Sequence, residues 1–551
     1  MIEQTASQAP AEIIIHSAQV VTTRSVEGSS IDIERCEAFA VRGGKIIALG
    51  TNEEILALQG AETELVDAKN RTVLPGFIES HVHLTQFGTN LLEVDCRPSS
   101  TPSVSALVKA ITDEAEKTPA GEWVLGWGWD ESRMAHGVAP TRWDLDAAAP
   151  DHPVFIRRTC AHMAVLNTRA LEISGIDSDT VDPNGGRLVR DEDGNLTGLV
   201  QESALNLVDL PPKTPAQLAR GIQLAQQQFF ARGITTIHDM ATQETDLEAL
   251  TALRETGSLL IRVRPWLWAL DGNGFTGMLD TAVERGYTSG TGDDLVRIQG
   301  MKFMLDGSIG GRTAAVEEPY EGSNETGILI RTAEEALPFV ASALSHGLRT
   351  AIHGIGDRAV ATATEVYRQV AAALPETAGM RNRIEHCALP SSEDLATMRS
   401  LGIIAASSVG FLRELGDSYL ANLGPERMAR VYPQRDFADH GIIAPPNSDC
   451  PVTDADPWPI IDAAVHRRSL GSRTLDTVQN ISVEQAIDGY TRQAAMASFE
   501  EGTIGSLCPG ALADFIIVDT DPTAADVDLR TLRSDETFVG GVRVHSAEPV
   551  T

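Results

Sequence analysis

The chain has 551 residues, of which 42% are hydrophobic, and its 44 Lys and Arg against 77 Asp and Glu give a formal net charge of −33. The apolar content is enough for a large core and excludes a mainly disordered chain, while the length exceeds that of one ordinary domain. A surface of this charge repels phosphate backbones and anionic lipids, which argues against nucleic-acid binding and a membrane-surface role.

The six cysteines are scattered along the chain, and no two have CxxC spacing. In a chain of this length they are typical of reduced thiols rather than of a disulfide framework. The first residues lack the basic start and long apolar core of a secretory signal. No apolar run approaches the roughly 20 residues needed to span a bilayer. We therefore expect a cytoplasmic protein without a membrane partner.

Short β-strands are expected at both ends of the chain. Because the termini of a domain commonly lie close together, we expect residues 1–72 and 501–551 to form one small β-sandwich. The strands are predicted where β-branched and apolar residues lie between glycine and polar breaks, over residues 13–22, 38–41, 45–49, 72–74, 514–518 and 537–544.

Between these ends, short apolar runs alternate with helical patterns such as 216–233 and 333–347, where apolar residues recur at helical spacing. Strands that alternate with helices form a parallel sheet, and eight of them imply a closed (β/α)8 TIM barrel, which we place at residues 73–500. The eight strands are predicted within residues 75–84, 233–240, 260–270, 296–308, 347–357, 381–389, 402–411 and 441–452.

The first and second predicted strands are separated by about 150 residues, which is far longer than an ordinary connection between a strand and a helix. The fold class is therefore α/β, with an inserted subdomain after strand one at about residues 90–215. Four of the seven tryptophans lie in this insertion: Trp123, Trp127, Trp129 and Trp143.

Residues that can bind a metal ion fall at the predicted C-terminal ends of the strands, where barrel enzymes build their active sites. His81 and His83 alternate along the first strand, so both side chains point to the same face. One HxH pair or one histidine near a strand end is weak evidence, but the ordered set is strong. Neutral imidazoles and carboxylates are ligands that zinc prefers. The predicted ligands are His81, His83, Lys302, His353, His386 and Asp449.

Several motifs resemble the amidohydrolase superfamily. PGFIESHVHL is similar to its first-strand motif, and the order HxH, Lys, His, His, Asp is similar to that of its dinuclear members. MKFMLDGSIGGRTAA, AIHGIGDRAV, RIEHCALP and NSDCPV resemble the amidohydrolase-3 family, the YtcJ-like group that includes N-substituted formamide deformylase. Two positions depart from the pattern: Glu79, where many relatives carry Asp, and the CAH of 160–162, where relatives often carry Gly before the histidine.

The resemblance covers nearly the whole chain and implies a metal-dependent barrel with a β-sandwich made by both termini. In this family pattern the strand-four lysine is carboxylated and bridges two divalent metal ions, so it implies a CO2-derived carbamate on Lys302. A free ammonium has no lone pair for a metal, whereas a carbamate offers two anionic oxygens. Without the carbamate, Lys302 would form an ordinary hydrogen bond or ion pair. We expect zinc, as one or two ions.

The resemblance also implies the reaction. A metal-activated water attacks the substrate, and Asp449 accepts its proton and returns it to the leaving nitrogen. His162 or His238 is expected to donate a hydrogen bond to the developing oxyanion. The plain alternative for His238 is a packed residue at the end of strand two.

Four further residues are candidates for substrate binding. Asp306 and Arg312 flank the glycine-rich segment after strand four, where glycine permits an unusual loop path close to a ligand. Trp127 and Trp129 alternate on a strand and would wall an aromatic or apolar pocket. The alternatives are an ion pair for Arg312 and core packing for one of the tryptophans.

The predicted function is hydrolysis of a carbon–nitrogen amide bond in a small-molecule substrate, with an N-substituted formamide or a cyclic amide as candidates. A heterocycle aminohydrolase, or deaminase, is the alternative. Mononuclear deaminases of this superfamily usually carry HxxE after strand five, whereas His353 is followed by Gly354, Ile355 and Gly356. A non-catalytic metal-binding protein is the third interpretation, since a fold alone never proves a function. A homodimer is compatible with the sequence.

Overall fold

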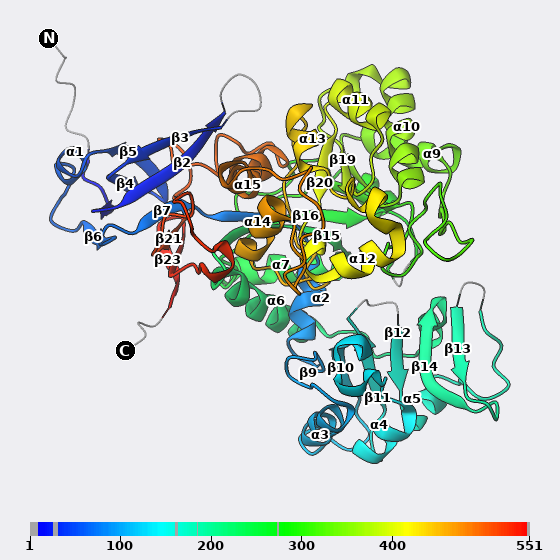
Figure 1. The fold of residues 1–551 in the computed structure, drawn as a ribbon. Coiled ribbons are helices and arrows are strands. Elements are labelled where there is room, and N and C mark those ends of the chain that lie inside the picture. Colours follow the sequence, from blue (N-terminus) through cyan, green and yellow to red (C-terminus); the bar gives the residue numbers. More distant parts are fainter. Residues whose placement is uncertain (1–8, 26–30, 160–162, 184–185, 273–274, 548–551) are drawn as a thin grey trace, which may run out of the picture.

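The structure, a computed structural model, describes residues 9–25, 31–159, 163–183, 186–272 and 275–547. Its centre is a nearly closed parallel sheet of seven strands, which confirms the mixed α/β prediction for this part of the chain (Figure 1). In sheet order, the strands are β20 (Ile404–Ser407), β19 (Arg383–His386), β18 (Arg349–Gly354), β17 (Gly300–Met304), β16 (Arg262–Trp268), β15 (Ile234–Thr242) and β8 (Phe77–Val82).

The eighth predicted strand, 441–452, is not a strand in the structure. The segment nevertheless runs between the two edges of the sheet. The amide of Ala405 in β20 donates to the Ile443 carbonyl (3.0 Å), and the amide of His83 donates to the Cys450 carbonyl (2.8 Å). A regular ladder is absent because Pro445 and Pro446 have no amide hydrogen to donate. The segment therefore bridges β20 and β8 with separate contacts.

Helices follow most of the strands and cover the outside of the sheet (Figure 1). No helix among the described residues is long and apolar enough to cross a bilayer. The helices of this region are α2 (Leu84–Asn90), α6 (Pro215–Phe230), α7 (Glu244–Glu255), α8 (Leu279–Glu284), α9 (Ala333–Ser345), α10 (Asp357–Ala373), α11 (Ser392–Leu401), α12 (Phe411–Met428), α13 (Gln434–Asp439), α14 (Pro457–His466) and α15 (Val483–Asp488).

Helix α6 shows how the sequence sets these elements. Thr214 is its N-cap, and the Thr214 side chain and that of Gln217 cap each other's backbone amides. The first helical residue is Pro215, whose fixed φ suits that position. Leu218 and Ile222 recur at helical spacing and are buried in the core cluster that also contains β8 and β15 residues. The predicted helices at 216–233 and 333–347 are thus confirmed as α6 and α9.

Strands from both ends of the chain share one six-stranded sheet, which packs on a four-stranded sheet (Figure 1). The ring centroids of Phe39 and Phe515, one from each sheet, lie 5.1 Å apart. The predicted strand at 13–22 divides into two strands, with Ser17 in the left-handed region (φ 51°) between them. In sheet order, the strands are β23 (Val542–Ser546), β22 (Glu536–Val539), β21 (Phe515–Val518), β7 (Thr72–Pro75), β2 (Gln19–Ser25) and β3 (Ile31–Cys36), and β5 (Lys45–Gly50), β4 (Ala38–Arg42), β1 (Ile13–His16) and β6 (Glu64–Asp67).

The segment between β8 and α6 forms a separate six-stranded sheet with its own helices, below the central sheet in Figure 1. Its two core clusters draw on this segment alone. The strands, in sheet order, are β13 (Gly186–Arg190), β14 (Leu196–Glu202), β12 (Met163–Leu166), β11 (Val154–Arg158), β10 (Val124–Trp129) and β9 (Val94–Asp95), and the helices are α3 (Val104–Ala115), α4 (Arg142–Ala148) and α5 (Thr168–Ile173).

Candidate metal centre and active site

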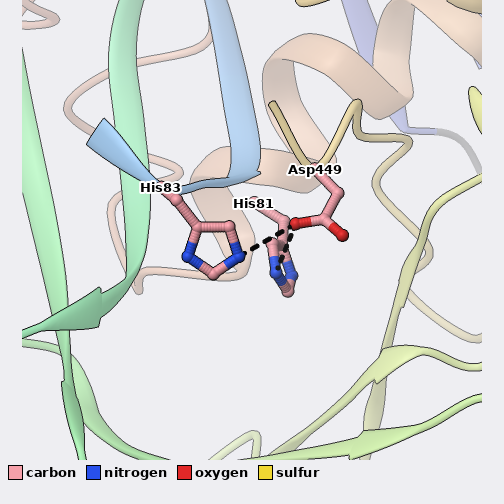
Figure 2. Close-up of side chains that lie close together, drawn as sticks. All are labelled: His81, His83 and Asp449. Carbon is pink, nitrogen blue, oxygen red and sulfur yellow. Dashed lines mark ion pairs between the residues drawn. The ribbon is translucent and has the colours of Figure 1, made fainter. Parts of the chain in front are cut away.

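Two histidines and one carboxylate converge at the C-terminal end of β8 (Figure 2). His81 Nε2 lies 3.2 Å and His83 Nε2 lies 3.1 Å from the same oxygen, Asp449 Oδ1. The two-residue spacing places both imidazoles on one face, as expected for a strand. His81 is fully buried, and a nitrogen or oxygen atom from each of the three side chains lies within 4.8 Å of the others.

Asp449 is placed by an unusual backbone conformation in the segment that bridges β20 and β8. Its φ is 54°, in the left-handed region that residues other than glycine rarely adopt. Its amide donates to the His81 carbonyl (3.1 Å), which fixes the segment against β8. Burial raises the pKa of the Asp449 carboxyl, but the proximity of His81 and His83 outweighs it and holds that pKa well below its usual range. Asp449 is therefore a carboxylate.

The remaining predicted ligand histidines lie beside this group. The His386 ring centroid is 4.8 Å from that of His81 and 4.4 Å from that of His353. His386 also has a positive φ (67°) at the end of β19. Such strained positions are costly and cluster at functional sites.

Hydrogen bonds fix which nitrogen of three of these histidines carries the proton. His353 Nε2 lies 3.0 Å from the Gly307 carbonyl, which can only accept, so Nε2 carries the hydrogen. His386 Nδ1 lies 2.7 Å from Ser408 Oγ, whose own hydrogen goes to Asn447 Oδ1, so Nδ1 is the donor. His81 Nδ1 lies 2.6 Å from a carboxylate oxygen and donates to it. In each case the second nitrogen keeps its lone pair.

The carboxylate that receives the His81 proton belongs to Glu385, which sequence reasoning missed. Arg383 holds Glu385 with two hydrogen bonds, Nε to Oε1 (2.7 Å) and Nη2 to Oε2 (2.8 Å), and both side chains are fully buried. Burial opposes the charge on Glu385, but Arg383, followed by His81, holds its pKa well below its usual range. The motif RIEH (383–386) held a signal for this role, because the charged residues Arg383 and Glu385 alternate along a strand whose residues are all buried.

His238 has the opposite proton arrangement. Arg383 Nη1 donates to His238 Nδ1 (2.8 Å), so the hydrogen of a neutral imidazole must sit on Nε2. Burial and the Arg383 charge hold the pKa of His238 well below its usual value, which keeps it neutral. Nε2 is buried and has no hydrogen-bond partner among the described residues. His238 is therefore a hydrogen-bond donor and not a ligand.

Lys302 lies on β17, level with Trp268 of β16 and Ala351 of β18. It is only 2% exposed, yet it forms no hydrogen bond or ion pair with any described residue. Burial lowers the pKa of Lys302 to about 8 although Glu385 and Asp449 oppose the shift. The lysine amine thus reaches its neutral form far more readily than an exposed one.

Glu79 is one of the departures from the family pattern. It lies two residues before His81 in β8 and contacts the segment that bridges β20 and β8. Its carboxyl accepts from the Ser448 amide (3.2 Å) and the His81 amide (3.3 Å), and lies 3.4 Å from the Tyr490 hydroxyl. Burial raises the pKa of Glu79 to about 8. A protonated glutamic acid here joins β8 to the segment that carries Asp449.

The structure places the predicted loop residues in supporting positions. Asp306 is buried and accepts from the amides of Ala315 (2.9 Å), Ile355 (3.1 Å) and Gly356 (2.8 Å), so it ties the loops after β17 and β18 together. Its Oδ1 also lies 3.3 Å from His353 Nε2. Arg312 Nε donates to Asn422 Oδ1 (2.9 Å) rather than to a carboxylate.

The remaining candidates lie in the inserted sheet. Trp129 is 1% exposed, belongs to the core of the insertion and donates from Nε1 to the Ile156 carbonyl (3.0 Å), which core packing fully explains. Trp127 is 7% exposed and stacks under the Arg97 guanidinium at 5.3 Å. His162 lies outside the described residues.

Comparison with known proteins identifies the family. The family model described as "Amidohydrolase family" matches residues 64–545. The chain belongs to the amidohydrolase family. This amidohydrolase is 27% identical to YtcJ of Bacillus subtilis over 530 residues, covering 93% of this chain and 96% of YtcJ. It is 25% identical to N-substituted formamide deformylase of Arthrobacter pascens over 521 residues, covering 92% and 94% of the two chains.

The amidohydrolase also resembles a solved structure, an uncharacterized metal-dependent hydrolase from Pyrococcus horikoshii. The TM-score is 0.76 at 29% identity, and the match covers 94% of this chain and 99% of the other. The amidohydrolase is therefore a metal-dependent hydrolase that acts on carbon–nitrogen bonds other than peptide bonds, and its family acts on small molecules.

Proposed function

We propose that the amidohydrolase holds a divalent metal at His81, His83 and Asp449, joined by His353, His386 and Lys302, and hydrolyses the amide bond of a small molecule there. The observation that carries the proposal is the arrangement of ring protons. His81, His353 and His386 each donate through one nitrogen to a fixed acceptor, so the other nitrogen offers a lone pair. Metal-binding histidines are commonly fixed in this way.

Unpaired buried atoms support the same site. His81 Nε2 and Asp449 Oδ1 are buried and make no hydrogen bond of good geometry with any residue that the structure describes. Leaving such atoms unpaired costs about 1–3 kcal/mol each, and more for a charged group. A cation between imidazole nitrogens and a carboxylate oxygen would remove that cost. Imidazole and carboxylate donors suit zinc, which we propose as the metal.

When bound, the metal would supply Lewis-acid chemistry that favours deprotonation of a water and polarises a carbonyl. The chain supplies the proton carrier. The lowered pKa of Asp449 favours its carboxylate form, and an oxygen of that carboxylate would take a proton and deliver it to the nitrogen that leaves. His238 presents an N–H that no described residue accepts, and we propose that it donates to the substrate carbonyl oxygen.

For Lys302 we propose the carbamate implied by the family pattern. Its supports are the burial of the side chain and the absence of a hydrogen-bond or ion-pair partner among the described residues. A neutral amine is the form that adds CO2, and the buried position makes that form accessible. The carbamate would place an anionic group beside the histidines and allow a second metal ion.

We propose an N-substituted formamide as the substrate class, which water would convert to formate and an amine. Support comes from the deformylase relative and from the wall beside Lys302. Trp268 lies level with Lys302 in the sheet, and its ring centroid lies 4.8 Å from that of Phe275 in a tilted contact. An aromatic wall suits an apolar group on the substrate nitrogen.

We further propose that the central sheet is a (β/α)8 barrel in which residues 443–450 take the place of the eighth strand. The separate hydrogen bonds to β20 and β8 support this. The division into a barrel at 73–500 with an insertion at about 90–215, and a sandwich from 1–72 and 501–551, is part of the same proposal.

The metal site can be tested with the double variant His81→Ala/His83→Ala. We expect a folded protein with little bound metal, since the pair supplies two ligands whereas the core holds the fold. Metal analysis and circular dichroism would be measured on the same preparation, and full metal occupancy would refute the assignment. A panel of N-substituted formamides, acyl amines and cyclic amides, assayed for amine release, would test the substrate class.

A further inference from the structure

A cavity of about 450 Å³ lies apart from the metal centre, and none of the proposed metal ligands lines it. Its wall comes from three parts of the chain. Arg133 belongs to the insertion, Arg232 and the first turns of α12 and α14 belong to the central region, and Arg530, Arg533 and Ser534 belong to the C-terminal region.

The wall of this cavity is rich in arginine in a chain whose net charge is −33. Five arginines line it, against three acids, Glu414, Asp454 and Asp456. Arg232 is paired with Asp454 through two contacts of 3.0 and 3.1 Å. Arg530 is paired outside the wall, with Asp528.

The remaining arginines of the wall differ in their ion pairs. Arg533 pairs with Asp456 at 3.9 Å. Arg413 and Arg133 form no ion pair with any residue that the structure describes. Two guanidinium groups are thus free to bind an anion.

The N-terminus of α12 adds to the same field. Gly410 and Arg413 mark the start of α12 and line the cavity, whereas the N-terminus of α14 is already capped by the Asp456 carboxylate, which accepts from the Trp458 amide (3.2 Å). A helix N-terminus carries partial positive charge that favours anions.

We propose that this cavity binds a small organic molecule through a compact oxyanion, either a phosphate or a carboxylate group. Arginine recognises both groups through paired N–H donors, which Arg133 and Arg413 would supply. The cavity is larger than one phosphate, whose volume is on the order of a few water molecules. The rest of the ligand would therefore occupy the space between the insertion and the C-terminal region.

The test is isothermal titration calorimetry of the full-length protein at constant ionic strength with inorganic phosphate, pyrophosphate and succinate. We expect saturable binding with one ligand per chain. Phosphate or pyrophosphate binding alone would identify a phosphate group as the ligand, and succinate binding would identify a carboxylate. Arg413→Ala should weaken binding at least tenfold, and Arg133→Ala should weaken it several-fold.

Two variants control for other causes. Arg430→Ala removes an exposed positive charge just beyond the end of α12, outside the cavity wall, and should leave binding unchanged. His83→Ala should also leave binding unchanged, because the metal centre is a separate place where anions could bind. Three results would each overturn the proposal. None of the three anions binds, Arg413→Ala and Arg430→Ala weaken binding equally, or His83→Ala weakens binding while Arg413→Ala does not.

Discussion

Glu385→Gln tests whether the carboxylate beneath His81 keeps that ligand in place. Glu385 accepts from His81 Nδ1 at 2.6 Å and from two nitrogens of Arg383 at 2.7 and 2.8 Å. Glutamine has the same shape but no charge, and its amide nitrogen cannot accept. The substitution therefore removes at least one of these hydrogen bonds and leaves the buried Arg383 charge without its partner.

Two separate losses follow from this geometry. Removing one partner of a buried ion pair costs about 3–5 kcal/mol of folding stability. Because glutamine retains one of the hydrogen bonds, we expect a loss at the lower end of this range, near 3 kcal/mol. Loss of the group that orients a metal-binding histidine costs about 10–100-fold in metal affinity, or roughly 1.4–2.7 kcal/mol. Glu385→Gln should therefore lose both stability and metal.

Glu500→Gln provides a matched control. Glu500 is 2% exposed and pairs with the fully buried Arg264 through contacts of 2.5 and 2.8 Å, but it touches no proposed ligand. Urea unfolding would measure stability, and competition with a chromophoric chelator would measure metal affinity. We expect similar stability losses in both variants and weakened metal binding only in Glu385→Gln. Equal metal affinity in the two variants would show that Glu385 has no role in holding the ligand.

Three further predictions can be measured directly. Asp449→Asn should lower kcat by about 10²–10⁴-fold with a smaller change in KM, because the amide cannot carry the proton. Steady-state kinetics on a substrate from the panel, together with metal analysis, would measure this. A near-normal kcat with metal present would refute the prediction. Lys302→Ala should lose metal and activity, and short carboxylic acids should restore part of both. Burial and the Asp239 charge raise the pKa of Asp246 to about 7 in the folded protein, above the value of about 3.9 in the unfolded chain. The contribution of Asp246 to folding stability is therefore full below about pH 4 and is lost as the pH rises through 7. Asp246→Asn should therefore become more stable relative to the wild type between pH 5 and 8, by at most about 4 kcal/mol, in urea unfolding.

The alternation of strands and helices was readable from the sequence because each pattern is local. Seven of the eight predicted runs contain strands of the central sheet. The eighth fails for a local reason as well, since Pro445 and Pro446 cannot donate to a ladder. Their presence in the run was visible, and it argues against a regular strand.

The site was only partly readable, because its decisive contacts join distant strands. The HxH spacing predicts that His81 and His83 share a face, but their approach to Asp449 depends on how the sheet closes. The pairing of His81 with Glu385 depends on packing across the sheet, which no local pattern reveals. Similarly, the alternation of Trp127 and Trp129 does not tell which of them enters the core of the insertion.

The shared terminal sheet has a consequence for biosynthesis. In that sheet β7 lies between β2, made early, and β21, made near the end of the chain. Until the ribosome has released β21, one edge of β7 has no partner, because Val73 and Leu74 pair along that edge with Ile517 and Ile516. Unpaired strand edges are sites of aggregation. A nascent or truncated chain that ends before Phe515 should thus depend on chaperones, whatever the state of its metal centre.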